Sequence, residues 1–356
     1  MVDMMSMDLT TAAPLCSLVV PLFNKEQTIR SCLESIQAQT ISSLEILVID
    51  DGSTDNSAAI VEEFARDDTR VVLIREPNGG PASARNIGLE TAIGTYVCFL
   101  DADDRLAPGF LEVLIAVMQR EHTDVARCAQ LFIEDLSEEG GEQQHIRRAG
   151  DHDRTVPGSE LYCRLFAELE VSLMSANSAL YRRDFLRRHR LSFNESLRHL
   201  EDVLFVARLY ACDARVAFSS QALYIYQHQG ERSLSEERHG LITALAPFVA
   251  ALERLESSNT IATTERQARL HYCAIVALTA IAGPVPKDNI NLYRNFLRSE
   301  VVVRIIAVLQ PKYLPNSLLV ARGLARLDYP HLLNAYCASL GQARRFRKIL
   351  RHSPQA

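Results

Sequence analysis

The sequence predicts an α/β protein with a mostly parallel sheet flanked by helices, followed by a helical C-terminal region. Over the first hundred residues, short apolar strands alternate with helical segments, which is the pattern of a parallel sheet covered on both faces. Beyond residue 233, apolar residues recur at helical spacing throughout. The 356 residues, 47% hydrophobic and 23% charged, suffice for one large domain and a smaller one.

The expected elements of the first half form a regular series. Each apolar run of strand length is followed by a longer segment with helical periodicity. Strands are expected at 16–22, 45–50, 70–75 and 95–100, and the helices that follow them at 28–39, 57–67, 82–93 and 110–119. This series predicts βα units that build the parallel sheet.

The second half of the chain is expected to complete the domain. A polar stretch at 134–154, rich in Glu, Gln, Gly and Arg, is predicted to be a mobile loop. The other elements are strands at 124–133, 175–181 and 215–226 and helices at 160–170, 183–189, 202–212, 241–255 and 268–281. We therefore expect a flexible N-terminal tail over 1–14, one large domain over 15–235 and a helical region over 236–356.

Composition and charge favour a cytoplasmic protein. The first fourteen residues lack a basic leader, and no apolar run reaches the roughly 20 residues that a membrane-spanning helix needs. Eight cysteines are scattered without a Cys-x-x-Cys pair, as expected of reduced core residues. The net charge is −6, but residues 312–356 hold eight Lys or Arg and one acid. This basic tail is either a contact for anionic lipid headgroups or nucleic acid, or a solvated helix face.

Polar clusters follow three of the expected parallel strands at the point where each strand ends. They are Asn24-Lys25-Glu26, Asp50-Asp51-Gly52-Ser53 and Asp101-Ala102-Asp103-Asp104. Because α/β sheets bind ligands at the carboxyl ends of their strands, three clusters at one edge predict a site.

The acidic cluster at 101–104 predicts a metal site. Three carboxylates in four residues can hold a hard divalent cation, and such a cation neutralises the diphosphate of an activated substrate as it departs. The alternative is an acidic loop that caps the next helix, for which Pro108 is well placed in the first turn.

Two further motifs lie at the same edge. A carboxylate in the segment 50–55 can accept a hydrogen bond from a base or a sugar hydroxyl, although such a segment is more often a helix cap. Gly79 and Gly80 precede a helix whose N-terminal amides favour an anion, with Arg85 one turn in, or they serve only a turn. No Gly-x-Gly-x-x-Gly follows the first strand and no P-loop motif occurs, which disfavours both of those nucleotide-binding folds.

Four motifs in order along the chain resemble glycosyltransferase family 2, which has the GT-A fold, a Rossmann-like nucleotide-diphospho-sugar fold. They are Ser-Leu-Val-Val-Pro-Leu-Phe-Asn at 17–24, Val-Ile-Asp-Asp-Gly-Ser-Thr-Asp at 48–55, Asn-Gly-Gly-Pro-Ala-Ser-Ala-Arg-Asn-Ile-Gly at 78–88 and Phe-Leu-Asp-Ala-Asp-Asp at 99–104. Four motifs at family spacing are far more specific than any one of them.

The resemblance implies roles for particular residues. Pro21, Asp51 and the region of Arg85 would surround the nucleoside. Asp101 and Asp103 would be the Asp-x-Asp pair that binds the sugar nucleotide and the metal, Mn²⁺ or Mg²⁺, with Asp104 beside them as a further metal residue. The donor implied is a nucleotide-diphospho-sugar, with a UDP-sugar as the first expectation.

A later acidic motif, Leu200-Glu201-Asp202-Val203, resembles the family's Glu-Asp motif. The resemblance makes Asp202 the general base that takes the acceptor hydroxyl proton as the oxygen attacks the anomeric carbon, with Glu201 binding substrate. The alternative is that both acids only begin a helix whose dipole they satisfy.

The segment 227–235 resembles one that closes over the diphosphate in some relatives, and a surface loop is an equal alternative. Its candidates for touching phosphate or metal are His228, Arg232 and Ser233. They are weak candidates, and Asn24 and Glu26 are no stronger.

The family resemblance implies an inverting, metal-dependent glycosyltransferase of the hexosyltransferase type. It would act on a glycan acceptor, lipid-linked by expectation, in cell-surface polysaccharide or lipopolysaccharide synthesis. We expect it at the inner face of the cell membrane through its basic tail, with no nucleic-acid partner.

Two other function classes are alternatives to the transferase. A sugar-1-phosphate nucleotidyltransferase is disfavoured because no Gly-rich strand-to-helix loop opens the chain. A catalytically silent GT-A module that binds a nucleotide sugar or scaffolds a complex remains the non-enzyme alternative. The presence of Asp101, Asp103 and Asp202 together argues against it.

Overall fold

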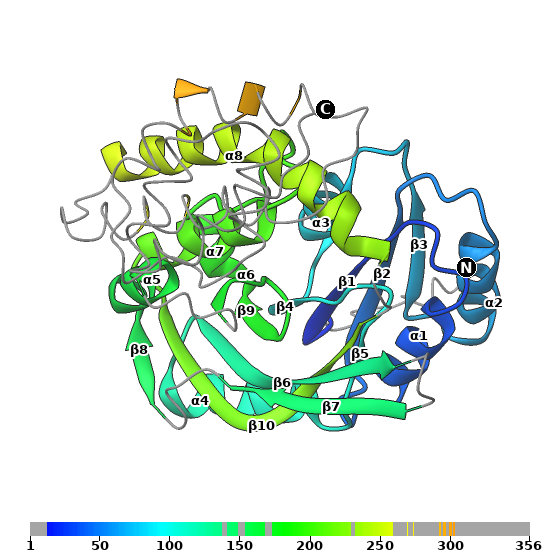
Figure 1. Cartoon of the computed structure of the whole chain (residues 1–356). Coiled ribbons are helices and arrows are strands. Elements are labelled where there is room, and N and C mark those ends of the chain that lie inside the picture. Colours follow the sequence, from blue (N-terminus) through cyan, green and yellow to red (C-terminus); the bar gives the residue numbers. More distant parts are fainter. Residues whose placement is uncertain are drawn as a thin grey trace, which may run out of the picture.

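The computed structural model describes five stretches of chain built around one sheet. These stretches are 13–136, 141–148, 154–167, 173–228 and 232–258, with single positions at 269, 273, 292, 295, 296, 299, 300 and 302. Within them, helices flank a sheet of ten strands (Figure 1). Eight strands follow the order β3-β2-β1-β4-β9-β6-β10-β5, while β7 pairs with β6 and β8 pairs with β10.

The first half of the chain forms the predicted parallel βα units. Its elements are β1 (Cys16–Leu22), α1 (Ile29–Gln37), β2 (Leu44–Asp50), α2 (Ser57–Asp67), β3 (Val71–Arg75), α3 (Pro81–Thr91) and β4 (Tyr96–Phe99). The pairs β3–β2, β2–β1 and β1–β4 are all parallel. In β1, Leu18 and Val20 belong to one buried hydrophobic cluster and Val19 to another. Both faces are therefore covered, which explains the unbroken apolar run.

The second half adds mixed pairing to the sheet. Its elements are β5 (Arg105–Leu106), α4 (Phe110–Glu121), β6 (Val125–Leu136), β7 (Gly141–Arg147), β8 (Thr155–Pro157), α5 (Gly158–Ala167), β9 (Ala179–Arg182), α6 (Arg183–Arg188), α7 (Glu201–Ala211) and β10 (Arg215–His228). Strand β9 is antiparallel to both β4 and β6, whereas β10 runs parallel to β6. The predicted α/β class is confirmed, with its parallel portion concentrated in the first half.

The prediction of a loop over 134–154 was wrong for part of that segment. Strand β6 continues to Leu136, and β7 pairs antiparallel with it. Across this pair the His145 ring stacks on Phe132 at 5.0 Å, and the Arg147 guanidinium lies 3.7 Å from the centre of the same ring. Backbone pairing with β6 and these contacts to the Phe132 ring stabilise β7, although β7 itself has almost no apolar residues.

Helix α8 (Arg232–Ser258) crosses above α5 and α7 (Figure 1). Its Leu245, Phe248 and Leu252 are buried in the same hydrophobic cluster as Phe205 of α7. The predicted domain boundary after residue 235 falls in the first turn of this helix and stays a prediction. Most of the expected helix at 268–281 and all of the basic tail at 312–356 lie outside the described residues. No helix in the described ranges has the length and hydropathy needed to cross a bilayer.

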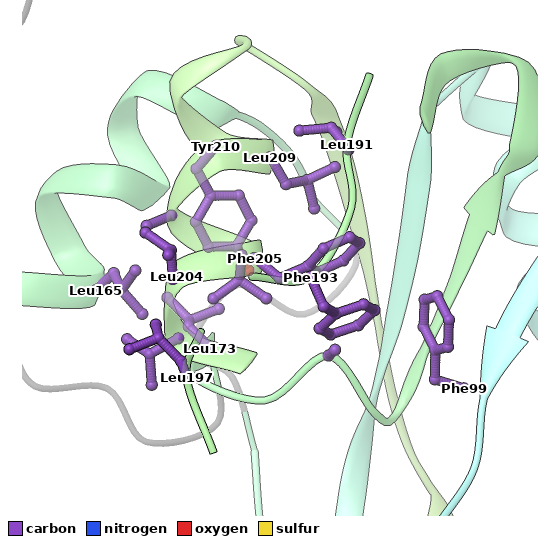
Figure 2. Packing of buried hydrophobic residues seen from close by; sticks show 14 of the residues in the cluster. Phe99, Leu165, Leu173, Leu191, Phe193, Leu197, Leu204, Phe205, Leu209 and Tyr210 are labelled. Carbon is purple, nitrogen blue, oxygen red and sulfur yellow. The ribbon is translucent and has the colours of Figure 1, made fainter. Parts of the chain in front are cut away.

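An aromatic cluster joins β4 to α7 inside the domain (Figure 2). The Phe193 ring stacks on Phe205 with centroids 4.3 Å apart and meets Phe99 edge-on at 5.1 Å. Such contacts add to the free energy of burying the rings. The end of β4 and the start of α7, which carry the two predicted acidic motifs, are thus fixed relative to each other.

Candidate active site

A cleft of about 390 Å³ opens where β1, β2 and β4 end. Its walls include Pro21 in β1 and Lys25 after β1, Asp51 after β2, Arg85 of α3, Asp101 and Asp103 after β4, Arg198 before α7 and Glu201 at the start of α7. The structure therefore brings together six predicted site residues in one cleft, namely Pro21, Asp51, Arg85, Asp101, Asp103 and Glu201.

Asp51 shapes the wall formed by the glycine pair. The side chain is buried, and its two carboxylate oxygens accept the backbone N–H groups of Gly79, at 2.6 Å, and Gly80, at 2.9 Å. Gly80 has φ of 90°, a conformation that favours glycine, and Pro81 begins α3 directly after it. The pair thus forms a turn held by Asp51, in agreement with the turn alternative.

The acids after β4 lie close enough to share one ion. One carboxylate oxygen from each of Asp101, Asp103 and Asp104 lies within 4.8 Å of the others. Asp103 is paired with Lys25 at 2.5 Å. Asp104 is almost fully buried and accepts the Tyr224 hydroxyl and the Gln227 backbone N–H. Burial, together with the charges of Asp101 and Asp103, raises the pKa of Asp104 well above its usual range.

This donor set fits a hard divalent cation. All three groups offer carboxylate oxygens, the ligands that Mg²⁺, Ca²⁺ and Mn²⁺ prefer. Burial and then the charges of Asp101 and Asp103 raise the pKa of Asp104, and a cation bound among the three groups would relieve their mutual repulsion. Asp104 faces β10, whereas Asp101 and Asp103 line the cleft.

Arg85 joins the two acidic motifs from inside the protein. Its side chain is only 5% exposed, and its guanidinium lies 2.8 Å from Asp101, 3.0 Å from Glu201 and 3.3 Å from Asp202. The same group lies 5.4 Å from the centre of the Phe193 ring. One buried cation thus faces three carboxylates, two of which follow it by more than a hundred residues.

The surroundings of Glu201 and Asp202, at the start of α7, raise the pKa values of both acids. Burial raises the pKa of Glu201 to about 7, the charge of Asp202 adds to this, and Arg85 opposes it. Burial also raises the pKa of Asp202, again opposed by Arg85. The Ser175 hydroxyl and the Ala176 backbone N–H are the nearest donors to one Asp202 oxygen, both at 3.4 Å. Both acids do lie in the first turn of α7, but their carboxylates face Arg85.

Sequence comparison places the chain in a known family. The sequence model of Glycosyl transferase family 2 matches residues 17–190. The putative glycosyltransferase EpsH of Bacillus subtilis is 32% identical over 252 residues, which cover 68% of this chain and 71% of EpsH. The chain belongs to glycosyltransferase family 2. The predicted family is confirmed, and with it the predicted enzyme class, since glycosyltransferases define this family.

A second relative and a solved structure agree with this assignment. The uncharacterized glycosyltransferase EpsJ of Bacillus subtilis is 32% identical over 224 residues, and the match spans 63% of each protein. The crystal structure of Staphylococcus aureus TarS 1–349 in complex with UDP-GlcNAc superposes with a TM-score of 0.62 at 21% identity, covering 94% of this chain and 91% of that one. The similarity in structure confirms the predicted GT-A fold.

Two of the remaining candidate residues, Asn24 and Glu26, have partners within the protein. Asn24 accepts the Thr54 backbone N–H at 2.8 Å, and Glu26 accepts the Asn56 side-chain amide at 2.9 Å. Both therefore hold the turn between β2 and α2. The side chains of His228, Arg232 and Ser233 lie outside the described residues.

Several residues of the site were missed by sequence reasoning. Asn177 donates to Asp101 at 2.7 Å, and Tyr224 donates to Asp104. Arg198 lines the cleft three residues before Glu201. Lys25, which pairs with Asp103, carried a signal, since it directly follows Asn24 at the end of β1. The others come from parts of the chain with no recognisable motif.

Proposed function

We propose that this chain is an inverting, metal-dependent glycosyltransferase that moves a sugar from a nucleotide-diphospho-sugar donor to a glycan acceptor in cell-surface polysaccharide synthesis. One observation carries the proposal: Arg85 contacts both Asp101, in a carboxylate cluster suited to a divalent cation, and Asp202, the predicted base. The relative named Succinoglycan biosynthesis protein ExoO, from Rhizobium meliloti, supports a role in polysaccharide synthesis.

The charge of the cleft supports metal dependence. Near the donor site there are six carboxylates and three cations, so that the site is net negative when all its groups are ionised. A nucleoside diphosphate is also negative, and the two would repel each other in a partly buried site. Asp101, Asp103 and Asp104 would hold the divalent cation, which neutralises charge on the departing diphosphate. A solved neighbour, the mannosyltransferase PcManGT in complex with GDP-Man and Mn²⁺, is consistent with this choice.

The position of Asp202 supports its role as general base. Burial raises its pKa, and a carboxylate with a raised pKa accepts a proton more readily at neutral pH. In an inverting transfer this carboxylate takes the acceptor hydroxyl proton while the oxygen attacks the anomeric carbon. Arg85 keeps the same carboxylate oriented by its contact at 3.3 Å. Glu201, which lines the cleft beside Arg198, would contact the substrate.

The wall formed by Pro21, Asp51 and Gly80 would take the nucleoside. Phe23 lies in the same wall and is 46% exposed, so that an aromatic face is available to a base. A UDP-sugar is the first donor to test, because TarS was solved with UDP-GlcNAc and with UDP.

A thermal-shift screen of UDP, GDP, CMP and dTDP with and without Mn²⁺ tests donor binding, since a ligand of the folded state raises its apparent stability. We expect a metal-dependent shift with one nucleotide. Asp103→Ala should abolish this shift, while Asp202→Asn should keep it and lower turnover by roughly 10²–10⁴-fold. Asp67→Ala, at an exposed acid of α2, is the control.

The same assays separate the alternatives. Nucleotide binding without transfer in the wild type would favour the catalytically silent module. Full transfer activity in folded Asp103→Ala and Asp202→Asn variants would refute the site.

We further propose that the protein acts at the cytoplasmic membrane surface on a lipid-linked acceptor. The proposal rests on the excess of Lys and Arg over acids in residues 312–356. Deletion of the chain after Leu340 should reduce sedimentation with vesicles that contain phosphatidylglycerol and leave binding to phosphatidylcholine vesicles unchanged. Equal sedimentation of the two forms would refute it.

A further inference from the structure

Asn86, the neighbour of Arg85 on α3, holds the segment that leads into α7. Its side chain is buried, its oxygen accepts the backbone N–H of Phe193 at 2.8 Å, and its amide nitrogen donates to the backbone carbonyl of Phe193 at 3.0 Å. The same nitrogen donates to the Glu195 carboxylate at 2.8 Å. One side-chain amide thus satisfies both peptide groups of Phe193, as a neighbouring strand would.

The segment held by Asn86 is also the support for Arg85. The Arg85 guanidinium lies 5.4 Å from the centre of the Phe193 ring. The same ring stacks on Phe205 of α7 at 4.3 Å (Figure 2). Four residues later, Leu197 is buried in the core, and α7 begins at Glu201. The short connection from Phe193 to Glu201 is therefore pinned at one end by Asn86 and at the other by Arg85.

We propose that Asn86, with Glu195 as its partner, is a positioning residue that sets the geometry of Arg85, Glu201 and Asp202. The proposal rests on the function proposed above. It requires the amide group of this side chain, since a carboxylate has no hydrogen to donate to the Phe193 carbonyl or to Glu195. Asn86 acts through Phe193 and Arg85, and its own contacts to protein account for both of its polar atoms.

The test introduces a repulsive carboxylate at position 86 and then removes the repulsion with a second substitution at position 195. Asn86→Asp sets a carboxylate against the Glu195 carboxylate and the Phe193 carbonyl, both formerly bound by the amide. Glu195→Gln alone keeps an oxygen that accepts from Asn86, and Glu195 is exposed beside a hollow of about 670 Å³. In the double variant, the new amide of residue 195 donates to the new carboxylate of residue 86. Glu90→Gln, an exposed acid of the same helix beside the same hollow, is the matched control.

The Asn86→Asp substitution should lower turnover more than it lowers the affinity for the donor. We expect Asn86→Asp to lower kcat by roughly ten- to hundred-fold, as for misplaced catalytic groups, with little change in the KM for the donor. The double variant should recover most of this loss, and Glu195→Gln and Glu90→Gln should stay near wild type. Wild-type kcat in Asn86→Asp, or a loss that Glu195→Gln does not reduce, would overturn the proposal.

Hydrogen exchange gives a second readout that needs no turnover. Amides from Phe193 to Asp202 should exchange faster in Asn86→Asp and slow again in the double variant. Unchanged exchange in this segment would overturn the positioning role even if the wild type shows no transferase activity. Absence of transfer in the wild type, with exchange behaving as expected, would instead refute the proposed function and leave the positioning network in place.

Discussion

Replacing Arg85 with methionine removes a cation that faces three carboxylates in the site. Methionine keeps much of the side-chain length and the contact with the Phe193 ring. Asp101, Glu201 and Asp202 lose their partner at 2.8, 3.0 and 3.3 Å. Breaking a buried ion pair by removing one partner costs about 3–5 kcal/mol, because the remaining charge is left uncompensated. We expect Arg85→Met to lower the free energy of unfolding by that amount at neutral pH.

The loss should depend on pH in a definite direction. In the wild type, the charge of Arg85 lowers the pKa values of Glu201 and Asp202, and burial raises them. Arg85→Met removes the lowering effect, so the pKa values of both acids rise further above their values in the unfolded chain. The folded variant then binds protons more readily than the unfolded chain, so its stability rises as pH falls. The difference between wild type and variant should therefore narrow towards pH 5.

Urea denaturation of both proteins at several pH values measures this difference. Arg120→Met is the control, because the Arg120–Glu121 pair is about half exposed and such pairs contribute about 0–1 kcal/mol. A loss for Arg85→Met no larger than that of the control would contradict the reasoning. A difference that widens as pH falls would contradict it equally.

Three further predictions concern single contacts. Because the pKa of Glu201 is raised to about 7, the free energy of unfolding of the wild type should fall relative to that of Glu201→Gln as pH rises from 4.5 to 7. Above pH 7 the difference between the two proteins should stay constant. Urea denaturation of both proteins at matched pH tests this, and a constant difference from pH 4.5 to 7 would contradict it. Tyr224→Phe leaves one oxygen of the buried Asp104 without its donor and should cost about 1–3 kcal/mol in chemical denaturation; an unchanged midpoint would count against that hydrogen bond. Gly88→Ala would place a methyl group 2.2 Å from a methyl of Val19, so overpacking should cost about 1–3 kcal/mol, and adding Val19→Ala should return part of the lost melting temperature.

The parallel half of the fold was predictable because its strands are buried on both faces. Continuous apolar runs such as 16–22 set the strands, and the parallel arrangement brings the ends of β1, β2 and β4 to one edge. Polar residues placed just after those strands therefore had to meet. The cleft with Asp51 and Asp101 follows from this rule without any knowledge of long-range register.

The rest of the site depends on pairings that no local pattern reveals. Asn177 reaches Asp101 because β9 enters antiparallel beside β4, and Tyr224 reaches Asp104 because β10 pairs with β5. Strand β7 was missed since its residues are polar and its stability comes from pairing with β6. Asn86 belongs to the motif at 78–88, but the motif does not reveal what the side chain binds, because the peptide groups of Phe193 lie 107 residues away in the sequence.

The wide spacing of the contacts to Arg85 has a consequence for how the protein is made. Asp101 follows Arg85 by 16 residues, but Glu201 follows it by 116. Synthesis runs from the N-terminus, and contacts between distant residues form late because they close long loops. We expect the first parallel unit to emerge from the ribosome with a cation in its interior that is only partly neutralised. Docking of α7 would then complete the charge balance and the catalytic acids in the same step, so that an incompletely made chain carries no assembled active site.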